Sequence, residues 1–155
     1  MSVEENKVIV RRFYESIGGE GWVRRIRGAG NREAETEKLL SAFFSEYYAP
    51  DCFMHATEGD RSLEEDIRET APYFTAFLDL KAIVEDIIAE GDKVVARWTM
   101  RGTHENTVRD IPATGKKVTV NGVTIKRMAN GKVVEEWALI NMLGLYQQIG
   151  AVPPK

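Results

Sequence analysis

The sequence contains little cysteine and no long apolar run. One cysteine, Cys52, among 155 residues excludes an internal disulfide and a metal site built from several thiolates. No apolar stretch approaches the roughly 18 residues that a membrane-spanning helix needs, so we expect no membrane partner. Residues 1–12 are charged throughout and lack the apolar centre of a secretory signal. These absences predict a cytoplasmic protein.

Neither sign of charge predominates. The chain has 21 basic and 24 acidic residues, a net charge of −3 and a pI near 5.5, and both signs are mixed along its length. We therefore expect no basic surface and no nucleic-acid partner. With 43% hydrophobic residues, a chain of this size buries enough surface for one core. We predict a single domain over residues 1–155.

Motifs for metal, phosphate and nucleophilic chemistry are missing as well. The two histidines, His55 and His104, are far apart and form no HxH or HExxH pattern, which argues against a metal site. The Gly-rich segment 18–30 lacks the spacing of a phosphate-binding loop, and no GxSxG nucleophile motif is present. We therefore expect no metal.

The first half of the chain has helical periodicity. Ile9, Phe13 and Ile17 recur at steps of four and predict a helix that ends at Gly18. The segment 18–31 that follows is rich in glycine and arginine, and we expect it to be a loop.

Two further helices are expected before residue 80. One covers about residues 39–48, where aromatic and leucine residues occur in pairs four apart. The other begins at Ser62, which has the capping-box spacing to Glu65. Pro72 should interrupt this helix and leave residues 73–77 as a separate turn.

The second half alternates between apolar and polar residues and predicts strands. The dipeptide Asn130-Gly131 is a strong hairpin-turn signal between the last two. The expected strands are 51–56, 80–89, 93–104, 118–128 and 132–142. Helices followed by such strands predict an α+β fold, in which N-terminal helices pack on the concave face of a curved antiparallel sheet. This α+β cone would take a ligand at its open end.

Alternation also predicts which side chains of the strand 93–104 face the interior of the cone. The even positions are apolar and end in a histidine, and we expect them inside: Val94, Ala96, Trp98, Met100, Gly102 and His104. The odd positions carry charges and hydroxyl groups, and suit solvent or a partner subunit: Arg97, Thr99, Arg101 and Thr103.

For the last predicted strand, 132–142, the inward face is harder to assign, because both of its faces could be buried. One face carries Trp137, Leu139 and Asn141, and the other carries Glu136, Ala138, Ile140 and Met142. We expect the Trp137 face inside, since it would set Trp98 and Trp137 around one space suited to a flat ligand. For His55, His104 and Asn141 the alternative is an ordinary role as hydrogen-bonded core residues.

Several motifs in the second half resemble one protein family. They are GDKVVARW (91–98), GTH (102–104), PATGK (112–116), NGKVVEEW (130–137) and LYQQIG (145–150). In this order they resemble the SnoaL-like polyketide cyclases, also called ester cyclases, of the nuclear transport factor two-like superfamily. The resemblance covers residues 53–152. The region Gly18–Lys38 is longer than the usual first connection of the family.

The resemblance implies a cofactor-independent intramolecular aldol reaction on a hydrophobic, carbonyl-rich small molecule. A base removes a proton from an acidified methylene group, the enolate attacks a carbonyl of the same molecule, and an acid returns the proton. In the family an aspartate four residues after a tryptophan removes and returns the proton, and the matching residue here is Asn141. An amide cannot accept and return a proton.

Asparagine at position 141, where the family has aspartate, leaves three interpretations. His104, which matches an inward histidine of the family, could be the base while Asn141 orients the substrate; Glu135 could reach inward instead; or the chain could bind a ligand without turnover. A fourth reading, hydrolysis of an epoxide, requires an inward aspartate near an arginine, and the pattern places none.

We therefore expect His104 and Asn141 as catalytic residues of a cyclase. The substrate-binding residues that we expect are Tyr14, Phe53, His55, Trp98, Met100 and Trp137. By analogy with the superfamily, the outer face of the sheet is the expected contact of a homodimer.

Overall fold

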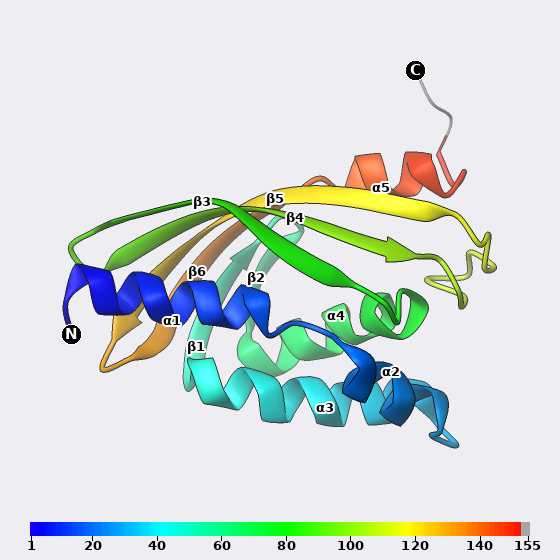
Figure 1. The fold of residues 1–155 in the computed structure, drawn as a ribbon, viewed down its shortest axis with the longest axis horizontal. Coiled ribbons are helices and arrows are strands. Elements are labelled where there is room, and N and C mark those ends of the chain that lie inside the picture. The colour runs from blue at the N-terminus through cyan, green and yellow to red at the C-terminus, as the bar shows by residue number, and fades with distance from the viewer. Residues whose placement is uncertain (153–155) are drawn as a thin grey trace.

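A curved six-stranded sheet covers a layer of helices in the computed structural model, which describes residues 1–152 (Figure 1). The helices are α1 (Val3–Glu15), α2 (Glu20–Arg27), α3 (Arg32–Tyr47), α4 (Leu63–Ala76) and α5 (Met142–Gln148). The strands are β1 (Tyr48–Ala56), β2 (Gly59–Ser62), β3 (Lys81–Glu90), β4 (Lys93–Thr103), β5 (Lys117–Ala129) and β6 (Lys132–Ile140). The predicted α+β fold with helices on the concave face is confirmed.

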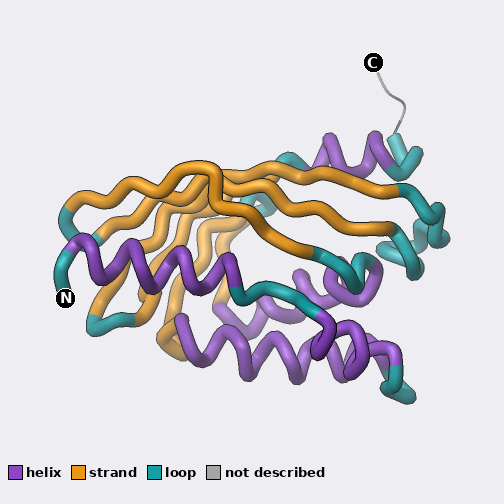
Figure 2. Tube along the Cα trace, in the orientation of Figure 1, coloured by secondary structure: helices purple, strands orange, loops and turns teal. Residues whose placement is uncertain are grey.

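The sheet is mixed, and the prediction of a fully antiparallel sheet was wrong. Its strand order is β2-β1-β6-β5-β4-β3, and β1 pairs with β6 in parallel. Parallel neighbours need a long connection, and here α4 and β3 to β5 provide it. Figure 2 shows the strands as one curved layer with most of the helices on one side of it.

The segment 18–31 contains a helix that the sequence analysis missed. Gly18 and Gly19 have positive φ angles of 74° and 111° and end α1 as predicted, but α2 starts directly afterwards. Its residue Ile26 is buried against Leu39 and Leu78. This small apolar contact stabilises a helix whose arginines and glycines had suggested a loop.

Pro72 does not interrupt α4. The helix begins with the predicted capping box between Ser62 and Glu65 and runs through Pro72 to Ala76. A proline removes one helical hydrogen bond, but Ala71 and Phe74 on either side are buried in the core. Tertiary packing therefore holds the helix together at this residue. The short, polar strand β2 was not predicted.

The prediction for β4 is confirmed at its apolar positions. Trp98 is buried on the concave face, and β4 pairs with β5 without a break in register. Opposite Trp98 stands Gly122, where a Cβ atom would lie 2.4 Å from the indole ring. The absence of a side chain at Gly122 is what allows the tryptophan to lie flat against the sheet.

The face of β6 that points inward is the opposite of the predicted one. Leu139 is 70% exposed and Asn141 is exposed as well, whereas Glu136 is buried. The reason is an ion pair between Glu136 and Lys126 on the neighbouring strand, which occupies the concave side. The Trp137 face had been expected inside because it would have set Trp98 and Trp137 around one space, but the buried ion pair places the opposite face there.

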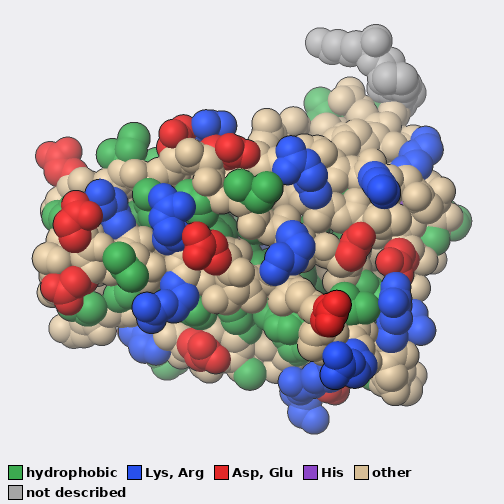
Figure 3. Space-filling view, viewed as in Figure 1, with side chains coloured by type: hydrophobic (Ala, Val, Ile, Leu, Met, Phe, Trp, Pro, Cys, Tyr) green, Lys and Arg blue, Asp and Glu red, His purple; other side chains and the backbone are tan. Residues whose placement is uncertain are grey.

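The outer surface carries acidic and basic side chains side by side, as Figure 3 shows for one face of the molecule. Arg97 and Asp86, for example, form an exposed ion pair between β4 and β3. Within residues 1–152 no helix is long and apolar enough to cross a membrane.

Candidate active site

A cavity of about 780 Å³ lies between the helices and the concave face of the sheet. Ligand sites in proteins typically measure roughly 300–1,000 Å³, so the cavity has room for a small molecule of several rings. Its wall is mostly apolar and includes Phe13, Phe43, Phe44, Met54, Phe74, Phe77, Trp98, Met100, Val118 and Val120. Such walls bind flat apolar ligands through surface burial.

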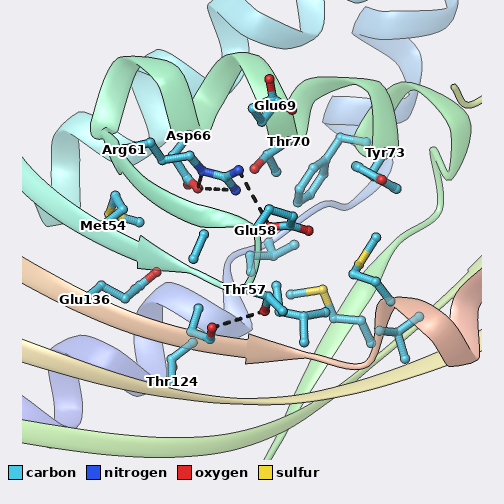
Figure 4. A pocket seen from close by; sticks show the side chains of 18 of the residues that line it. Met54, Thr57, Glu58, Arg61, Asp66, Glu69, Thr70, Tyr73, Thr124 and Glu136 are labelled. Carbon is cyan, nitrogen blue, oxygen red and sulfur yellow. Dashed lines mark hydrogen bonds and ion pairs between the residues drawn. The ribbon is translucent and has the colours of Figure 1, made fainter.

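Figure 4 shows the polar side chains of one wall, where Arg61 on β2 contacts Asp66 on α4. The Nε and Nη2 atoms of Arg61 both lie 2.8 Å from Oδ1 of Asp66. Nη1 of Arg61 lies 3.8 Å from Glu58. Within residues 1–152 the other carboxylate oxygen, Oδ2 of Asp66, forms no hydrogen bond with a protein group, and Asp66 lines the cavity.

The pKa of the Asp66 carboxyl is shifted upward by its surroundings. It is only 8% exposed. Burial raises the pKa of its carboxyl, the negative charge of Glu136 raises it further, and Arg61 opposes the shift. A carboxyl with a raised pKa in an apolar cavity is the usual form of a general acid or base.

A second polar group lies in the wall of the cavity around Lys126, whose side chain is 1% exposed. Its Nζ donates to Tyr48 Oη at 2.5 Å and to Glu136 Oε1. Tyr48 Oη also donates to Glu136 Oε1, at 2.5 Å, and Tyr14 Oη lies 2.5 Å from Thr124 Oγ1. The ammonium group therefore has its partners inside the protein.

The pKa of Lys126 reflects two opposing effects. Burial lowers this pKa, but the carboxylate of Glu136 and the hydroxyl of Tyr14 outweigh burial and raise it. Burial and the charge of Glu136 raise the pKa of Tyr48 well above its ordinary value. A charged Lys126–Glu136 pair with neutral tyrosines is the state that these shifts favour.

Three of the residues expected at the site line the cavity: Tyr14, Trp98 and Met100. The rings of Tyr14 and Trp98 are stacked, with centroids 6.2 Å apart. His104 is on the inward face as predicted and is fully buried, but it is not part of the cavity wall.

Phe77 separates His104 from the cavity. The two rings are stacked with centroids 5.2 Å apart, and Phe77 itself lines the cavity. Thr114 contacts Nδ1 of His104 twice, through Oγ1 at 3.0 Å and through its donating amide at 3.3 Å. Burial lowers the pKa of His104. These contacts anchor the loop after β4 to the core.

Asn141 lies outside the cavity, and its predicted inward placement was wrong. It is the N-cap residue of α5, and its Oδ1 accepts a hydrogen bond from the amide of Gly144 at 2.9 Å. Asparagine is among the best N-cap residues, which accounts for an amide at this position without any chemical role.

Phe53, His55 and Trp137 also lie on the convex side rather than in the cavity. Phe53 is 45% exposed. His55 stacks on Trp137 with ring centroids 5.0 Å apart, and its Nε2 lies 2.7 Å from Glu135 Oε2. Glu135 raises the pKa of His55. Glu135 therefore faces outward too, and does not reach the cavity.

The sequence analysis missed the Arg61–Asp66 pair, although one signal for it was present. Leu63, Asp66 and Ile67 follow the spacing i, i+3, i+4, which puts the carboxyl on the apolar face of α4. For Arg61 no such signal exists, because β2 is short and polar. Residues 1–152 contain no group of three or more His, Cys, Asp or Glu side chains suited to hold a metal ion.

Comparisons with solved structures support the fold. AclR from Streptomyces galilaeus, described as a "putative hydroxylase", superposes with a TM-score of 0.75 at 25% identity, over 99% of this chain and 86% of that chain. A "putative SnoaL-like polyketide cyclase" from Jannaschia sp. CCS1 gives 0.71 at 24% identity, over 97% and 94%. IdmH from Streptomyces antibioticus, a "putative polyketide cyclase", gives 0.61 at 25% identity, over 76% and 92%.

Sequence comparison gives the family. A search among curated proteins found no match. The family model described as "SnoaL-like polyketide cyclase" matches residues 32–149, which includes α3 to α5 and the whole sheet. The chain belongs to the SnoaL-like polyketide cyclase family.

Proposed function

We propose that this protein is a cofactor-independent cyclase that closes a ring in a hydrophobic, carbonyl-rich small molecule. The observation that carries the proposal is the buried Asp66 carboxyl, held by Arg61 in the wall of an apolar cavity. Family membership makes this class of reaction the expected one.

In the proposed reaction Asp66 Oδ2 takes a proton from a methylene carbon next to a carbonyl group. The electron pair of that C–H bond forms the enolate, which attacks a second carbonyl carbon of the same molecule and makes the new C–C bond. The resulting alkoxide takes the proton back from Asp66. The carboxyl is thus regenerated, and no external acid, oxidant or reductant is consumed.

The neighbouring groups have supporting roles in this proposal. The Arg61 guanidinium beside the carboxylate stabilises the enolate oxygen, and such preorganised charge is often the largest catalytic term. The aromatic walls fold the substrate so that its two reacting carbons meet. His104 and Asn141 have no part in the proposed reaction, because neither lines the cavity.

Proton abstraction can be tested with 1-tetralone, a two-ring ketone whose spontaneous exchange is slow. Its methylene group next to the carbonyl would incorporate deuterium from D₂O, followed by proton NMR. Asp66→Asn should reduce this rate by roughly 10²–10⁴. Asp86→Asn is the control, since Asp86 is exposed on the outer face. Equal rates in Asp66→Asn and wild type would refute the role of Asp66.

Epoxide hydrolysis is a second candidate, favoured by the same Arg61–Asp66 pair. The sequence analysis disfavoured this reaction because it placed no aspartate inward, and Asp66 removes that objection. In this reaction the carboxylate takes a proton from water as the water oxygen bonds to an epoxide carbon and the ring C–O bond breaks. The released alkoxide then takes the proton back from Asp66. Cyclohexene oxide in ¹⁸O-labelled water distinguishes the two functions, because a hydrolase would form the labelled diol and a cyclase would not. Ligand binding without either reaction would indicate a non-catalytic binding protein.

We also propose a homodimer formed through the convex face of the sheet. Exposed apolar side chains gather there, among them Phe53, Ile83, Val123 and Leu139. Apolar surface of this kind is often covered by a partner, and the superfamily resemblance suggests a second copy of the chain.

A further inference from the structure

A hydrogen-bonded cluster at one end of the cavity joins α4, the helix that also carries Asp66, to the loop after β4 and to α5. Arg109 in the loop after β4 donates from Nη2 to Glu69 Oε2 at 2.6 Å and from Nε to Tyr73 Oη at 3.1 Å. Tyr73 Oη lies 2.5 Å from Tyr146 Oη on α5. All four residues line the cavity. Arg109 and Glu69 are about half exposed. The cluster therefore lies at the end of the cavity that faces solvent.

The hydrogen bonds in this cluster have a preferred direction. Arginine has donors only, so Tyr73 Oη accepts from Arg109. In the contact between Tyr73 and Tyr146 either hydroxyl could be the donor. A hydroxyl that accepts from a cation is the better donor, and we infer on this ground that the Tyr73 proton goes to Tyr146 Oη. Within residues 1–152 the Tyr146 hydroxyl forms no other hydrogen bond. Its own proton is therefore left without an acceptor in the protein.

The loop that carries Arg109 is built to hold it in place. Arg109 and Asp110 both have positive φ angles, 42° and 67°, which residues with a side chain adopt uncommonly. A bridge between Val108 and Ile111 closes the turn, and Val108 is buried. The guanidinium also lies over the Tyr73 ring, 5.6 Å from its centroid.

We propose that Arg109, Tyr73 and Tyr146 form a donor chain whose last hydroxyl, that of Tyr146, binds a carbonyl oxygen of the substrate at the solvent end of the cavity. The chain thereby selects flat molecules that carry a carbonyl group at their outer end. This selection deepens the proposed function, on which it rests for the identity of the ligand as a substrate, but binding can be measured without turnover.

The tyrosine at the end of the chain stays neutral over the physiological pH range. Burial raises the pKa of Tyr146 to about 12. A neutral phenol keeps its proton and donates it to an acceptor. A carbonyl or an ether oxygen is such an acceptor, and an aromatic C–H is not.

A pair of three-ring probes tests the proposal directly. 9-Fluorenone and fluorene have the same shape, but only fluorenone has a carbonyl group. Affinity is measured by calorimetry, and the C=O stretch of ¹³C-labelled fluorenone by infrared difference spectroscopy. We expect fluorenone to bind more tightly than fluorene to the wild type, with its C=O stretch shifted to lower frequency.

Variants of the three residues measure how much each contributes to binding of the carbonyl group. Tyr146→Phe should weaken fluorenone binding by about tenfold, abolish the frequency shift and leave fluorene binding unchanged within about twofold. Tyr73→Phe and Arg109→Lys should reduce the shift without abolishing it. Tyr47→Phe is the matched control, since Tyr47 makes no side-chain hydrogen bond within residues 1–152 and does not line the cavity.

Two results would overturn the donor chain. One is a full frequency shift in Tyr146→Phe, and the other is a larger loss of the shift in Tyr73→Phe than in Tyr146→Phe, which would reverse the direction of the chain. Asp66→Asn should retain both fluorenone binding and the shift. If Asp66 has no acid–base role, fluorenone binding and its frequency shift are unchanged. The proposed reaction and the donor chain can therefore fail separately.

Discussion

Arg61 binds Asp66 through one carboxylate oxygen only: both of its contacts, each of 2.8 Å, end on Oδ1. The guanidinium thus fixes the carboxyl group on α4 while leaving Oδ2 open to the cavity. Because Asp66 is buried, the arginine also limits how far the pKa of the carboxyl rises. The first two predictions concern these two effects.

Arg61→Gln should move the pH dependence of 1-tetralone exchange to higher pH. Arg61 lowers the pKa of Asp66 against the effects of burial and of Glu136, so its removal raises that pKa further. Since the base must be deprotonated, the acidic limb of kcat/KM shifts upward with it. A pH–rate profile measures the shift. Arg97→Gln, on the convex face, should leave the limb where it is, and an unshifted limb in Arg61→Gln would contradict the prediction.

Asp66→Asn should stabilise the protein at neutral pH. The folded-state pKa of Asp66 is raised, so ionisation costs stability as pH rises above the unfolded value of about 3.9. An amide of the same shape avoids this cost. The gain should disappear below that pH, where both states of the wild type are protonated. Urea unfolding at neutral and acidic pH measures the difference, and a destabilised variant at pH 7 would show that the bond to Arg61 outweighs burial.

Lys126→Met should destabilise the fold by about 3–5 kcal/mol, because it leaves Glu136 charged and unpaired in the interior. The double variant Lys126→Met, Glu136→Gln should recover much of this loss, since no charge then remains buried. Urea unfolding of the three proteins gives both values. A double variant as unstable as the single one would mean that packing around Lys126, and not charge, dominates.

Asn141→Asp should not create or increase catalytic activity, although aspartate is the residue that the family resemblance implies there. The side chain caps α5 on the outside of the cavity, and aspartate caps a helix about as well as asparagine. We expect exchange of 1-tetralone and the unfolding midpoint to remain close to those of the wild type. A clear gain in exchange would show that the carboxylate does reach the substrate.

Leu139→Lys should dissociate the proposed dimer. Leu139 is the most exposed apolar residue of the convex face, and a charge there would be costly to bury at an interface. Sedimentation velocity at micromolar concentration should give a dimer for the wild type and a monomer for the variant. A monomeric wild type would remove the basis of the proposal.

The sequence predicts the fold better than the site, and the two strands β4 and β6 illustrate why. In β4 one set of alternating residues is apolar and the other is charged, so the buried face is evident. In β6 neither face is clearly polar, and the interior takes Glu136 because Lys126 stands opposite it. A pairing between two distant charged residues is invisible in a local pattern. For Asp66 a local signal was present in the apolar face of α4, whereas Arg61 on the short, polar strand β2 had none.

The helices that were wrongly predicted have a related cause. Pro72 lies in a continuous helix, and α2 forms in a segment rich in glycine. In both cases local preference is overridden by burial against other elements, among them Leu39 and Leu78 for Ile26. Such contacts depend on the assembled fold and cannot be read from neighbouring residues.

The parallel pairing of β1 with β6 has a consequence for the order of assembly. The β1–β2 hairpin, next to the helix that carries Asp66, joins the rest of the sheet only through β6. Trp98 and the apolar residues Met100, Val118 and Val120 of the cavity wall lie beyond it, on β4 and β5. During synthesis these two parts of the sheet therefore stay unpaired until the last strand has emerged and docked between them. A ribosome-bound chain that stops before residue 132 lacks the strand that joins them.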